Sequence, residues 1–337
     1  MRERDAVRPL PMLPNELGFS AGRSGSVGPR IAQIRVLANS PPPNAIGDTS
    51  MNDLTEITGL RDYPLARRGL MMTGLISGFT LATTRVDAQM IHTDTEGLDA
   101  GETKIPTTSG DLPAYYARPA KGDGFPVVLV IEEIFGVHEH IKDLCRRLAK
   151  DGYLAVATEY YARIGDLSKM TDTPTIFKEV ISKAPDAQMM SDLDSTAAWA
   201  AKNKGSATKL AVTGFCRGGR QTWLYAEHNP NLKAAAAWYG PVNTPDTDIQ
   251  PHSPLELAAE LKCPLLGQYG GQDTSIKVED VQAAAAKAKA AGKTVEIVVY
   301  PDAPHGFNAD YRPSYRAADA TAAWSRMLAW FKTYGVA

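Results

Sequence analysis

Hydrophobic and polar positions along residues 91–337 alternate between two patterns, one typical of strands and one typical of helices. Short apolar runs rich in β-branched residues, such as residues 125–131, are typical of parallel strands that are buried on both faces. Between these runs, apolar residues recur every three or four positions, as they do on the buried face of a helix. Strand and helix units that alternate in this way predict an α/β fold, in which helices cover both faces of a mostly parallel sheet.

The individual elements follow from the length and spacing of these blocks. The pattern predicts strands at residues 125–131, 153–157, 210–213, 234–238, 264–269 and 294–300. It predicts helices at residues 141–151, 192–202, 219–227, 278–291 and 316–334. The last of these helices presents an apolar stripe made of Ala320, Trp324, Met327, Leu328 and Phe331. No internal repeat and no second change of composition follows residue 91, so we expect a single domain over residues 91–337.

The first ninety residues have a different character. Residues 1–50 contain seven of the 23 prolines and no lysine, and they show neither helical nor strand periodicity. Segments such as Pro41-Pro42-Pro43 cannot build an apolar core, so we expect residues 1–50 to be disordered. Because the character changes at Met51, we expect that Met51 is the true start and that residues 1–50 are an over-extended reading frame.

Residues 51–88 resemble a signal peptide. Arg67-Arg68 precedes an uncharged segment at residues 69–84, and Val86-Asp87-Ala88 forms a small-x-small exit. Paired arginines before a weakly apolar segment resemble a twin-arginine export signal, although Ala66 stands where Ser or Thr is usual. The segment is short for a membrane span, which needs about 20 apolar residues. We therefore expect export to the periplasm; the alternatives are a short amphipathic helix or a tail that stays in the cytoplasm.

Composition and charge narrow the classes of partner. The 337 residues are 44% hydrophobic and 22% charged, which is typical of a globular protein. The 36 Lys and Arg residues against 38 Asp and Glu residues give a formal net charge of -2. A chain without a basic surplus lacks the charge that neutralises phosphates, so we expect no nucleic-acid partner. Three cysteines cannot form a disulfide framework and leave at least one free thiol.

The strongest chemical signal is the segment Gly214-Phe215-Cys216-Arg217-Gly218-Gly219, between a predicted strand and a predicted helix. It has the form of the nucleophile elbow G-x-S-x-G, with cysteine in place of serine. A nucleophile at such a sharp turn needs neighbours without side chains that would clash. The turn would also place the Cys216 sulfur at a helix N-terminus, where the dipole favours the reactive thiolate. The alternative is a glycine-rich turn that carries a buried structural cysteine.

Two later loops supply the partners that a nucleophilic cysteine needs. Asp273 follows the strand that ends at Tyr269, and His305 follows the strand that ends at Tyr300. The order of nucleophile, acid and histidine along the chain is that of α/β-hydrolases. All three residues lie just beyond the carboxyl ends of strands, where open α/β sheets place their sites. Asp302 is a competing acid, but it precedes His305 on the same loop and fits a turn residue better.

A fourth loop, Glu132-Glu133-Ile134-Phe135-Gly136, directly follows the strand at residues 125–131. In α/β-hydrolases this loop supplies one of two backbone N–H groups to the oxyanion hole, and the residue after the nucleophile supplies the other. We expect Glu132 to belong to a solvated pair of carboxylates. The segment His138-Glu139-His140 is not expected to bind a metal, because residues two apart do not share a helix face. We expect a solvated loop there.

Five segments together resemble the dienelactone hydrolase family, or carboxymethylenebutenolidases: E-E-I-F-G (132–136), L-A-V-A-T-E-Y-Y-A-R (154–163), G-F-C-R-G-G (214–219), G-G-Q-D (270–273) and P-H-G-F (304–307). The resemblance spans roughly residues 100–335 and implies an α/β-hydrolase fold. The family opens the lactone ring of dienelactones during the degradation of chloroaromatic compounds, without metal or organic cofactor. It implies that Cys216 is the nucleophile, His305 the base and Asp273 its orienting partner.

The resemblance extends to the loops beside the nucleophile. Glu133 matches the family's glutamate that contacts the resting thiol and is displaced when substrate binds. We expect Glu133 to be catalytic, with either His305 or Glu133 taking the proton of Cys216. Ile134 and Arg217 match the two backbone donors of the oxyanion hole. The residue after the nucleophile is commonly apolar in relatives, so the Arg217 side chain is a departure.

A second departure concerns the substrate. The characterised branch of the family places an arginine four residues after the catalytic histidine to hold a substrate carboxylate, and here that position is Ala309. Arg312 and Arg316 lie nearby and are the only candidates for this role. We therefore expect hydrolysis of a lactone or carboxylic ester, with a dienelactone-type substrate implied by the resemblance alone.

The overall expectation is a monomeric enzyme that forms a thioester acyl-enzyme and needs no cofactor, metal or stable membrane span. Two alternatives stay open: an α/β-hydrolase-fold binding protein without catalysis, and a general esterase for a different small ester. A thiol redox protein would need a resolving cysteine near Cys216, and no C-x-x-C motif exists.

N-terminal sequencing of the mature protein tests the expected leader. If residues 51–88 are a cleaved signal, the mature chain should begin near Gln89, after the small-x-small exit. A mature chain that begins near residue 1 would contradict both the signal and the start at Met51.

Overall fold

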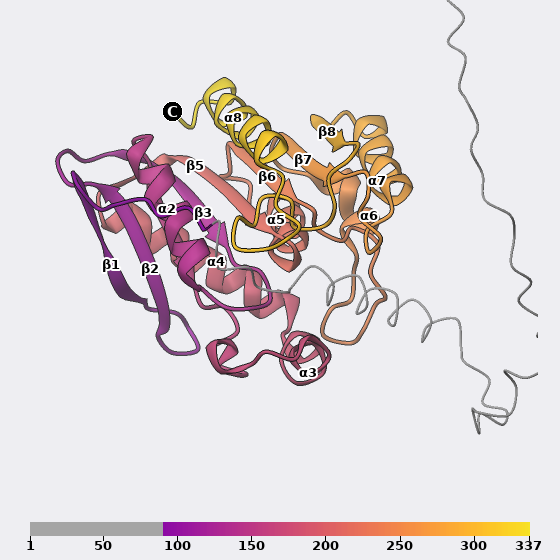
Figure 1. The fold of residues 1–337 in the computed structure, drawn as a ribbon, viewed down its shortest axis with the longest axis horizontal. Coiled ribbons are helices and arrows are strands. Elements are labelled where there is room, and N and C mark those ends of the chain that lie inside the picture. The colour runs from indigo at the N-terminus through magenta and orange to yellow at the C-terminus, as the bar shows by residue number, and fades with distance from the viewer. Residues whose placement is uncertain (1–89) are drawn as a thin grey trace, which may run out of the picture. The chain divides into compact units, whose positions relative to one another are not determined.

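The apolar β-branched runs form the middle of an eight-stranded sheet in residues 90–337, the part of the chain that the computed structural model describes (Figure 1). The strand order is β1-β2-β4-β3-β5-β6-β7-β8. The strands are β1 (Leu98–Ile105), β2 (Leu112–Pro119), β3 (Phe125–Ile131), β4 (Leu154–Thr158), β5 (Gly205–Phe215), β6 (Ala234–Trp238), β7 (Leu265–Gly270) and β8 (Val295–Tyr300). Neighbours from β4 to β8 pair in parallel, whereas β1 pairs antiparallel with β2, and β2 with β4. The predicted mostly parallel sheet is confirmed.

Helices cover both faces of this sheet, as predicted. They are α2 (Glu139–Lys150), α3 (Thr173–Glu179), α4 (Asp186–Lys202), α5 (Arg217–His228), α6 (Pro254–Leu257), α7 (Val278–Ala290) and α8 (Ala317–Thr333). In Figure 1, α2 lies over β2 and β4 and α8 over β6 and β7, on the side of the viewer. Helices α4 and α5 pack against each other and against β3, β5 and β6 on the opposite face. The result is a three-layered α/β-hydrolase fold.

Two strands at the edge of the sheet escaped the sequence pattern. Strand β1 is only partly buried along most of its length, and β2 alternates buried and exposed positions at its start. Strands in which exposed positions interrupt the buried ones do not produce the continuous apolar run that marks a central strand. Helix α4 also begins six residues before the predicted position, because Asp186, Met189 and Met190 are buried in its first turns. The predicted helices otherwise match the observed ones to within a few residues.

The carboxyl ends of the parallel strands gather the candidate site. Strands β3 and β6 are buried on both faces, with Leu129 and Ala236 fully inaccessible to solvent. Full burial of each valine, leucine or isoleucine contributes roughly 1.5–3 kcal/mol, which makes these strands a rigid base. Because parallel strands end at the same edge of the sheet, the loops after β3, β5, β7 and β8 meet there.

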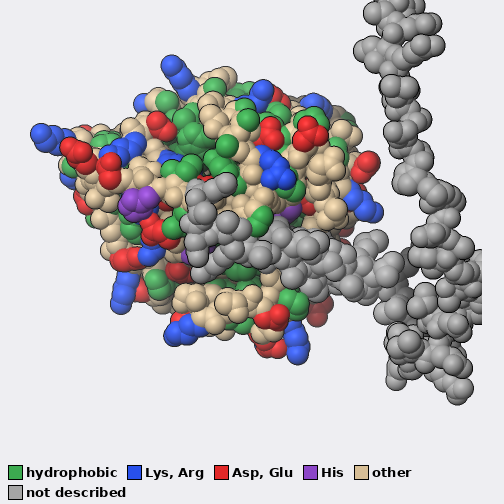
Figure 2. Space-filling model, viewed as in Figure 1, with side chains coloured by type: hydrophobic (Ala, Val, Ile, Leu, Met, Phe, Trp, Pro, Cys, Tyr) green, Lys and Arg blue, Asp and Glu red, His purple; other side chains and the backbone are tan. Residues whose placement is uncertain are grey.

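The surface agrees with the near-neutral net charge. On the face drawn in Figure 2, basic and acidic side chains are interspersed around the visible edge of the domain. The absence of a nucleic-acid partner stays a prediction. Among residues 90–337, no helix is both long and apolar enough to cross a membrane. The segments expected to be disordered (1–50) and to form a signal peptide (51–88) lie outside the described residues.

Replacing Gly205 by alanine should destabilise the fold, because β5 begins at a point without room for a side chain. A β-carbon at Gly205 would lie 2.5 Å from Val127 Cγ2 and 2.6 Å from the carbonyl oxygen of Ala200. We expect Gly205→Ala to lower the free energy of unfolding by about 1–3 kcal/mol, the usual cost of overpacking, in urea unfolding followed by circular dichroism. Gly101→Ala is the matched control, since a β-carbon at Gly101 in strand β1 meets nothing within 4 Å. Equal stability of the two variants would contradict the prediction.

Candidate active site

Cys216 occupies the sharp turn between β5 and α5. Its backbone has φ 56° and ψ -119°, and it immediately precedes the first residue of α5. A residue other than glycine that adopts a positive φ costs of order 1–3 kcal/mol, so surrounding contacts must hold the turn. The Cys216 N–H donates to the carbonyl oxygen of Trp238 at 3.0 Å, and the Gly219 N–H donates to the carbonyl oxygen of Cys216 at 2.9 Å. The predicted strand-to-helix turn is present at the predicted residues.

The glycines around this turn are required by close backbone contacts. A β-carbon at Gly214 would lie 2.3 Å from the carbonyl oxygen of Gly218. A β-carbon at Gly218 would lie 2.4 Å from the carbonyl oxygen of Glu132, in the loop after β3. The turn at Cys216 and the loop after β3 are therefore in close contact through their backbones, at Gly218 and Glu132.

His305 and Asp273 form a buried pair beside Cys216. His305 Nδ1 lies 2.7 Å from Asp273 Oδ2, and their side chains are 4% and 1% exposed. The other oxygen of Asp273 accepts the N–H groups of Ser275 and Ile276, which fixes the carboxylate. Burial tends to lower the pKa of His305, but the charges of Asp273 and Cys216 and its hydrogen bonds to both raise it to about 10.

An aromatic residue, Tyr239, packs against His305 and was not predicted from the sequence. Tyr239 follows β6 with φ 38°, and its ring packs edge-on against His305 with centroids 5.1 Å apart. Burial raises the pKa of the Tyr239 hydroxyl well above its ordinary value, so the ring carries no charge at neutral pH. The signal that could have found this residue is its place directly after a central strand, next to the strand that carries Cys216.

Two backbone N–H groups are the candidate donors of an oxyanion site. Ile134 lies in the loop after β3 and is fully buried, and Arg217 is the first residue of α5. Within residues 90–337, neither N–H donates a hydrogen bond, as expected of donors kept for a ligand. The Arg217 side chain turns away, because its Nη2 donates to Gln250 Oε1 at 2.7 Å. Burial and the nearby Arg220 lower the pKa of Arg217 to about 10.

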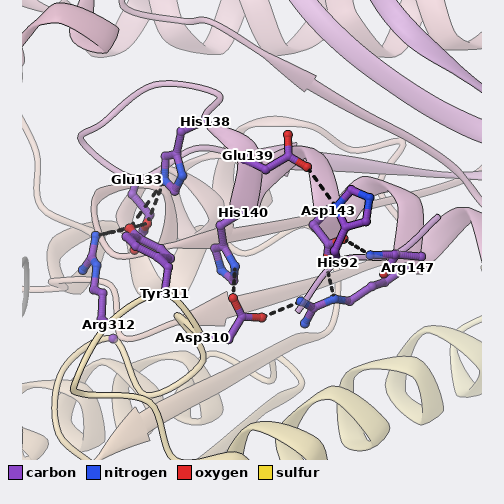
Figure 3. A network of polar contacts seen from close by, with 12 residues as sticks. His92, Glu133, His138, Glu139, His140, Asp143, Arg147, Asp310, Tyr311 and Arg312 are labelled. Atoms are coloured by element: carbon purple, nitrogen blue, oxygen red, sulfur yellow. Dashed lines mark hydrogen bonds and ion pairs between the residues drawn. The ribbon is translucent and has the colours of Figure 1, made fainter. Parts of the chain in front are cut away.

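Three donors form a cage around Glu133 (Figure 3). The Tyr311 hydroxyl donates to Glu133 Oε2 at 2.7 Å, and Arg312 Nη2 donates to the same oxygen at 3.2 Å. His138 Nε2 lies 3.3 Å from it. Burial acts to raise the pKa of Glu133, but the Arg312 charge and the His138 contact outweigh it and hold this pKa well below its ordinary value. Glu133 is therefore a carboxylate at neutral pH.

The resting contact between Glu133 and the thiol is not formed here as a hydrogen bond. All three donors approach Glu133 Oε2, and Oε1 has no hydrogen-bond partner in the described part of the chain. The donors Tyr311 and Arg312 belong to the loop after His305, which sequence reasoning did not connect with Glu133. Since they are remote from Glu133 in sequence, only the folded chain brings them together.

Of the two candidate arginines, only Arg312 lies in the site. It is 2% exposed, its guanidinium lies over the rings of Phe135 and Tyr311, and it also donates to the Tyr311 hydroxyl. Arg316 is exposed and donates to the backbone carbonyls of Pro313 and Tyr315. An arginine seven residues after the histidine thus reaches the loop after β3.

Two expectations of solvated side chains are wrong. Glu132 is completely buried, because the loop after β4 covers it and the Tyr160 N–H donates to its Oε1 at 2.9 Å. His140 is 1% exposed, and its Nδ1 lies 3.2 Å from Asp310 Oδ1. Figure 3 shows the polar contacts continuing from Asp310 to Arg147 on α2. In both cases a loop from elsewhere in the chain supplies the cover, which periodicity cannot reveal.

The described residues contain no cluster of His, Cys, Asp and Glu arranged to hold a metal ion. Asp302 is exposed and lies in a turn, as expected, whereas Asp273 is buried against His305. Cys145 and Cys263 are buried free thiols, and burial raises the pKa of both, that of Cys263 to about 12.

Several known proteins are similar to this chain. A family model described as the dienelactone hydrolase family matches residues 112–335. A protein from Methylorubrum extorquens named "Putative carboxymethylenebutenolidase" is 54% identical over 275 residues, covering 81% of this chain and 94% of the relative. A protein of the same name from Escherichia coli (strain K12) is 51% identical over 266 residues, covering 79% of this chain and 98% of the relative. A crystal structure titled "Putative Dienelactone Hydrolase" from Klebsiella pneumoniae is 54% identical with a TM-score of 0.69, covering 70% of this chain and 99% of that chain.

Replacing Asp273 by asparagine should lower the pKa of His305 from about 10, because the charge of Asp273 is a main cause of the raised value. The midpoint is measured by NMR titration of the imidazole. Activity should fall by about 10²- to 10⁴-fold, the usual contribution of a positioned acid–base group. Asp302→Asn is the matched control on the neighbouring turn and should leave the midpoint unchanged. An unchanged midpoint in Asp273→Asn would refute the assignment.

Proposed function

Because the chain belongs to the dienelactone hydrolase family and is therefore a hydrolase of esters or lactones, we propose that its reaction runs through Cys216, His305 and Asp273. Membership confirms the family that the sequence motifs predicted. The observation that carries the proposal is the position of Cys216 in a strained turn at the N-terminus of α5, beside the hydrogen-bonded pair of His305 and Asp273. Such a turn exposes a nucleophile to substrate and to the positive end of the helix dipole.

The first chemical step forms a thioester. His305 holds the proton of the Cys216 thiol as an imidazolium, and the thiolate sulfur attacks the acyl carbon of the substrate. The carbon–oxygen bond of the ester or lactone then breaks, and His305 returns the proton to the leaving oxygen. Asp273 holds the Nδ1 proton and stabilises the imidazolium, which a pKa of about 10 for His305 favours at neutral pH.

The negative charge that develops on the acyl oxygen needs donors that are already in place. The N–H groups of Ile134 and Arg217 are the candidates, because neither has an acceptor within residues 90–337. Such donors typically contribute about 2.7–4 kcal/mol each. In the second step, His305 deprotonates a water molecule that attacks the thioester, and the Cys216 sulfur leaves and is protonated again.

Glu133 acts as a fixed charge in the resting enzyme and not as the base. Its cage of Tyr311, Arg312 and His138 stabilises the ionised form, which makes it a weak proton acceptor. A substrate carboxylate could replace Glu133 on Arg312, whose Nε and Nη1 have no acceptor in the described part of the chain. The two donors of Arg312 without an acceptor support a dienelactone-type substrate, in which a carboxylate accompanies the lactone ring.

The main alternative is a general esterase for a neutral small ester, in which Arg312 has no substrate contact. A non-catalytic binding protein of the same fold is the second alternative. It has no need of the buried pair of His305 and Asp273 beside a strained cysteine. Export through Arg67-Arg68, a monomeric state and a role in the degradation of aromatic compounds complete the proposal; each rests on sequence or family resemblance.

A panel of p-nitrophenyl esters and unsaturated lactones tests the proposal. We expect Cys216→Ser to reduce hydrolysis by roughly 10³-fold or more, as loss of a catalytic nucleophile does. Stoichiometric iodoacetamide should label Cys216 and abolish activity, since burial raises the pKa of Cys145 and Cys263 and keeps them as thiols. Cys263→Ser is the matched control and should keep both activity and labelling. Full activity after complete modification of Cys216 would end the proposal.

A further inference from the structure

Two glutamates clamp the loop that carries Glu133 and Ile134. Glu132 follows β3, and its Oε1 accepts the N–H of Tyr160 in the loop after β4 at 2.9 Å. Glu159 follows β4, and its Oε1 accepts the N–H of Val137 in the loop after β3 at 2.9 Å. Each side chain therefore reaches across to the other loop, and the two contacts hold the loop after β3 at its beginning and at its end.

Both ends of this loop are also closely packed. Gly136 has φ 77°, and a β-carbon there would lie 3.0 Å from Glu159 Oε2. At the other end, the carbonyl oxygen of Glu132 would lie 2.4 Å from a β-carbon at Gly218, in the first turn of α5. A shift of the loop would therefore move Ile134 relative to Cys216.

Two ionised carboxylates cannot make this arrangement. Glu132 Oε2 is buried and has no hydrogen-bond donor among the described residues, and the group that acts on it most strongly is the Glu159 carboxyl. The two carboxyl groups can satisfy each other only with a proton between them. Glu132 is fully buried, and the strongest influences on it are its burial, Glu159 and the N–H groups of Tyr160 and Tyr161, with no cation among them. Like charges at such a site repel, so one group stays protonated.

The groups that face the pair favour Glu132 as the holder of the proton. Burial and then the Glu159 charge raise the pKa of Glu132 well above its ordinary value. Burial also raises the pKa of Glu159, but the Val137 N–H, the hydrogen bond from Glu132 and the charge of Lys142 on α2 act in the opposite direction. Asp166 is the remaining charge that acts on Glu159, and it raises the pKa.

We propose that Glu132 and Glu159 share one proton, and that the resulting acid–carboxylate pair positions the loop that carries Ile134 and Glu133. Both glutamates are positioning residues, because they act through the loop and not on the substrate. The catalytic consequence rests on the proposed function, in which the Ile134 N–H holds the oxyanion. Donors of this kind act only from a fixed position, and a misplacement of about 1 Å can cost roughly 10²-fold in rate.

Glu132→Gln is the informative variant. Its amide has the size of the acid, can accept the Tyr160 N–H and donates permanently to Glu159, so it should rescue most of the activity that Glu132→Ala loses. We expect Glu132→Ala to lower kcat by roughly 10- to 10²-fold with a smaller change in KM. In wild type, kcat/KM should fall at alkaline pH where the pair loses its proton, and Glu132→Gln should retain activity to higher pH.

Two readouts do not depend on catalysis. The carbonyl stretching band of a buried protonated carboxyl should appear in infrared difference spectra of wild type and of the exposed control Glu139→Gln, and be absent in Glu132→Gln. Because the folded state holds a proton that the unfolded state releases above its ordinary pKa, wild-type stability should fall as pH rises from about 5 to about 8. The amide of Glu132→Gln cannot lose this proton. The Tm of Glu132→Gln minus the Tm of wild type should therefore become more positive as pH rises over that range.

The outcomes separate this proposal from the proposed function. A carbonyl band that persists in Glu132→Gln, or a Tm difference that does not change with pH, would overturn the shared proton. Wild-type kcat in Glu132→Ala would overturn the positioning role. If Cys216→Ser retained full activity while the band and the Tm difference behaved as expected, the proposed function would fail and the proton-sharing pair would stand.

Discussion

The left-handed backbone of Cys216 is the constraint on which the rest of the site depends. The Cys216 N–H donates to the carbonyl oxygen of Trp238, which holds this backbone conformation. Gly214 and Gly218 have no side chains, so the neighbouring backbones pack directly against the turn. Strands β3 and β6, which are buried on both faces, keep Cys216 in this strained conformation. The same close packing links the turn to the loop after β3, so the position of the sulfur and the position of the Ile134 N–H are set together.

Electrostatics separates two adjacent glutamates that have the same chemistry. Glu133 and Glu132 are both completely buried. Arg312, Tyr311 and His138 surround Glu133, and the Arg312 charge and the His138 contact keep its pKa low in spite of burial. Glu132 faces another carboxyl group, so burial and like charge raise its pKa. Glu133 is thus a fixed negative charge in the candidate site, whereas we infer that its neighbour Glu132 keeps a proton.

The sequence predicted the parts of the site that depend on local rules. The elbow around Cys216 follows from glycine spacing, and the positions of Asp273 and His305 follow from their place after predicted strands. The polar surroundings could not be predicted in this way. Tyr311, Arg312 and Asp310 come from the loop after His305, and they contact residues more than a hundred positions away in the chain. Hydrophobic periodicity says nothing about which loop covers a buried histidine or carboxylate.

What the sequence by itself determined is the order of strands and helices, the family and the identity of the candidate nucleophile, because each is carried by short-range pattern. The antiparallel strands β1 and β2 and the early start of α4 required the folded chain, since half-buried elements lack a clear apolar period. Tertiary structure alone decided the ionisation of Glu132 and Glu133. The pKa of a buried carboxyl depends on the charges and donors that surround it in space, and these come from loops that meet only at the carboxyl edge of the sheet.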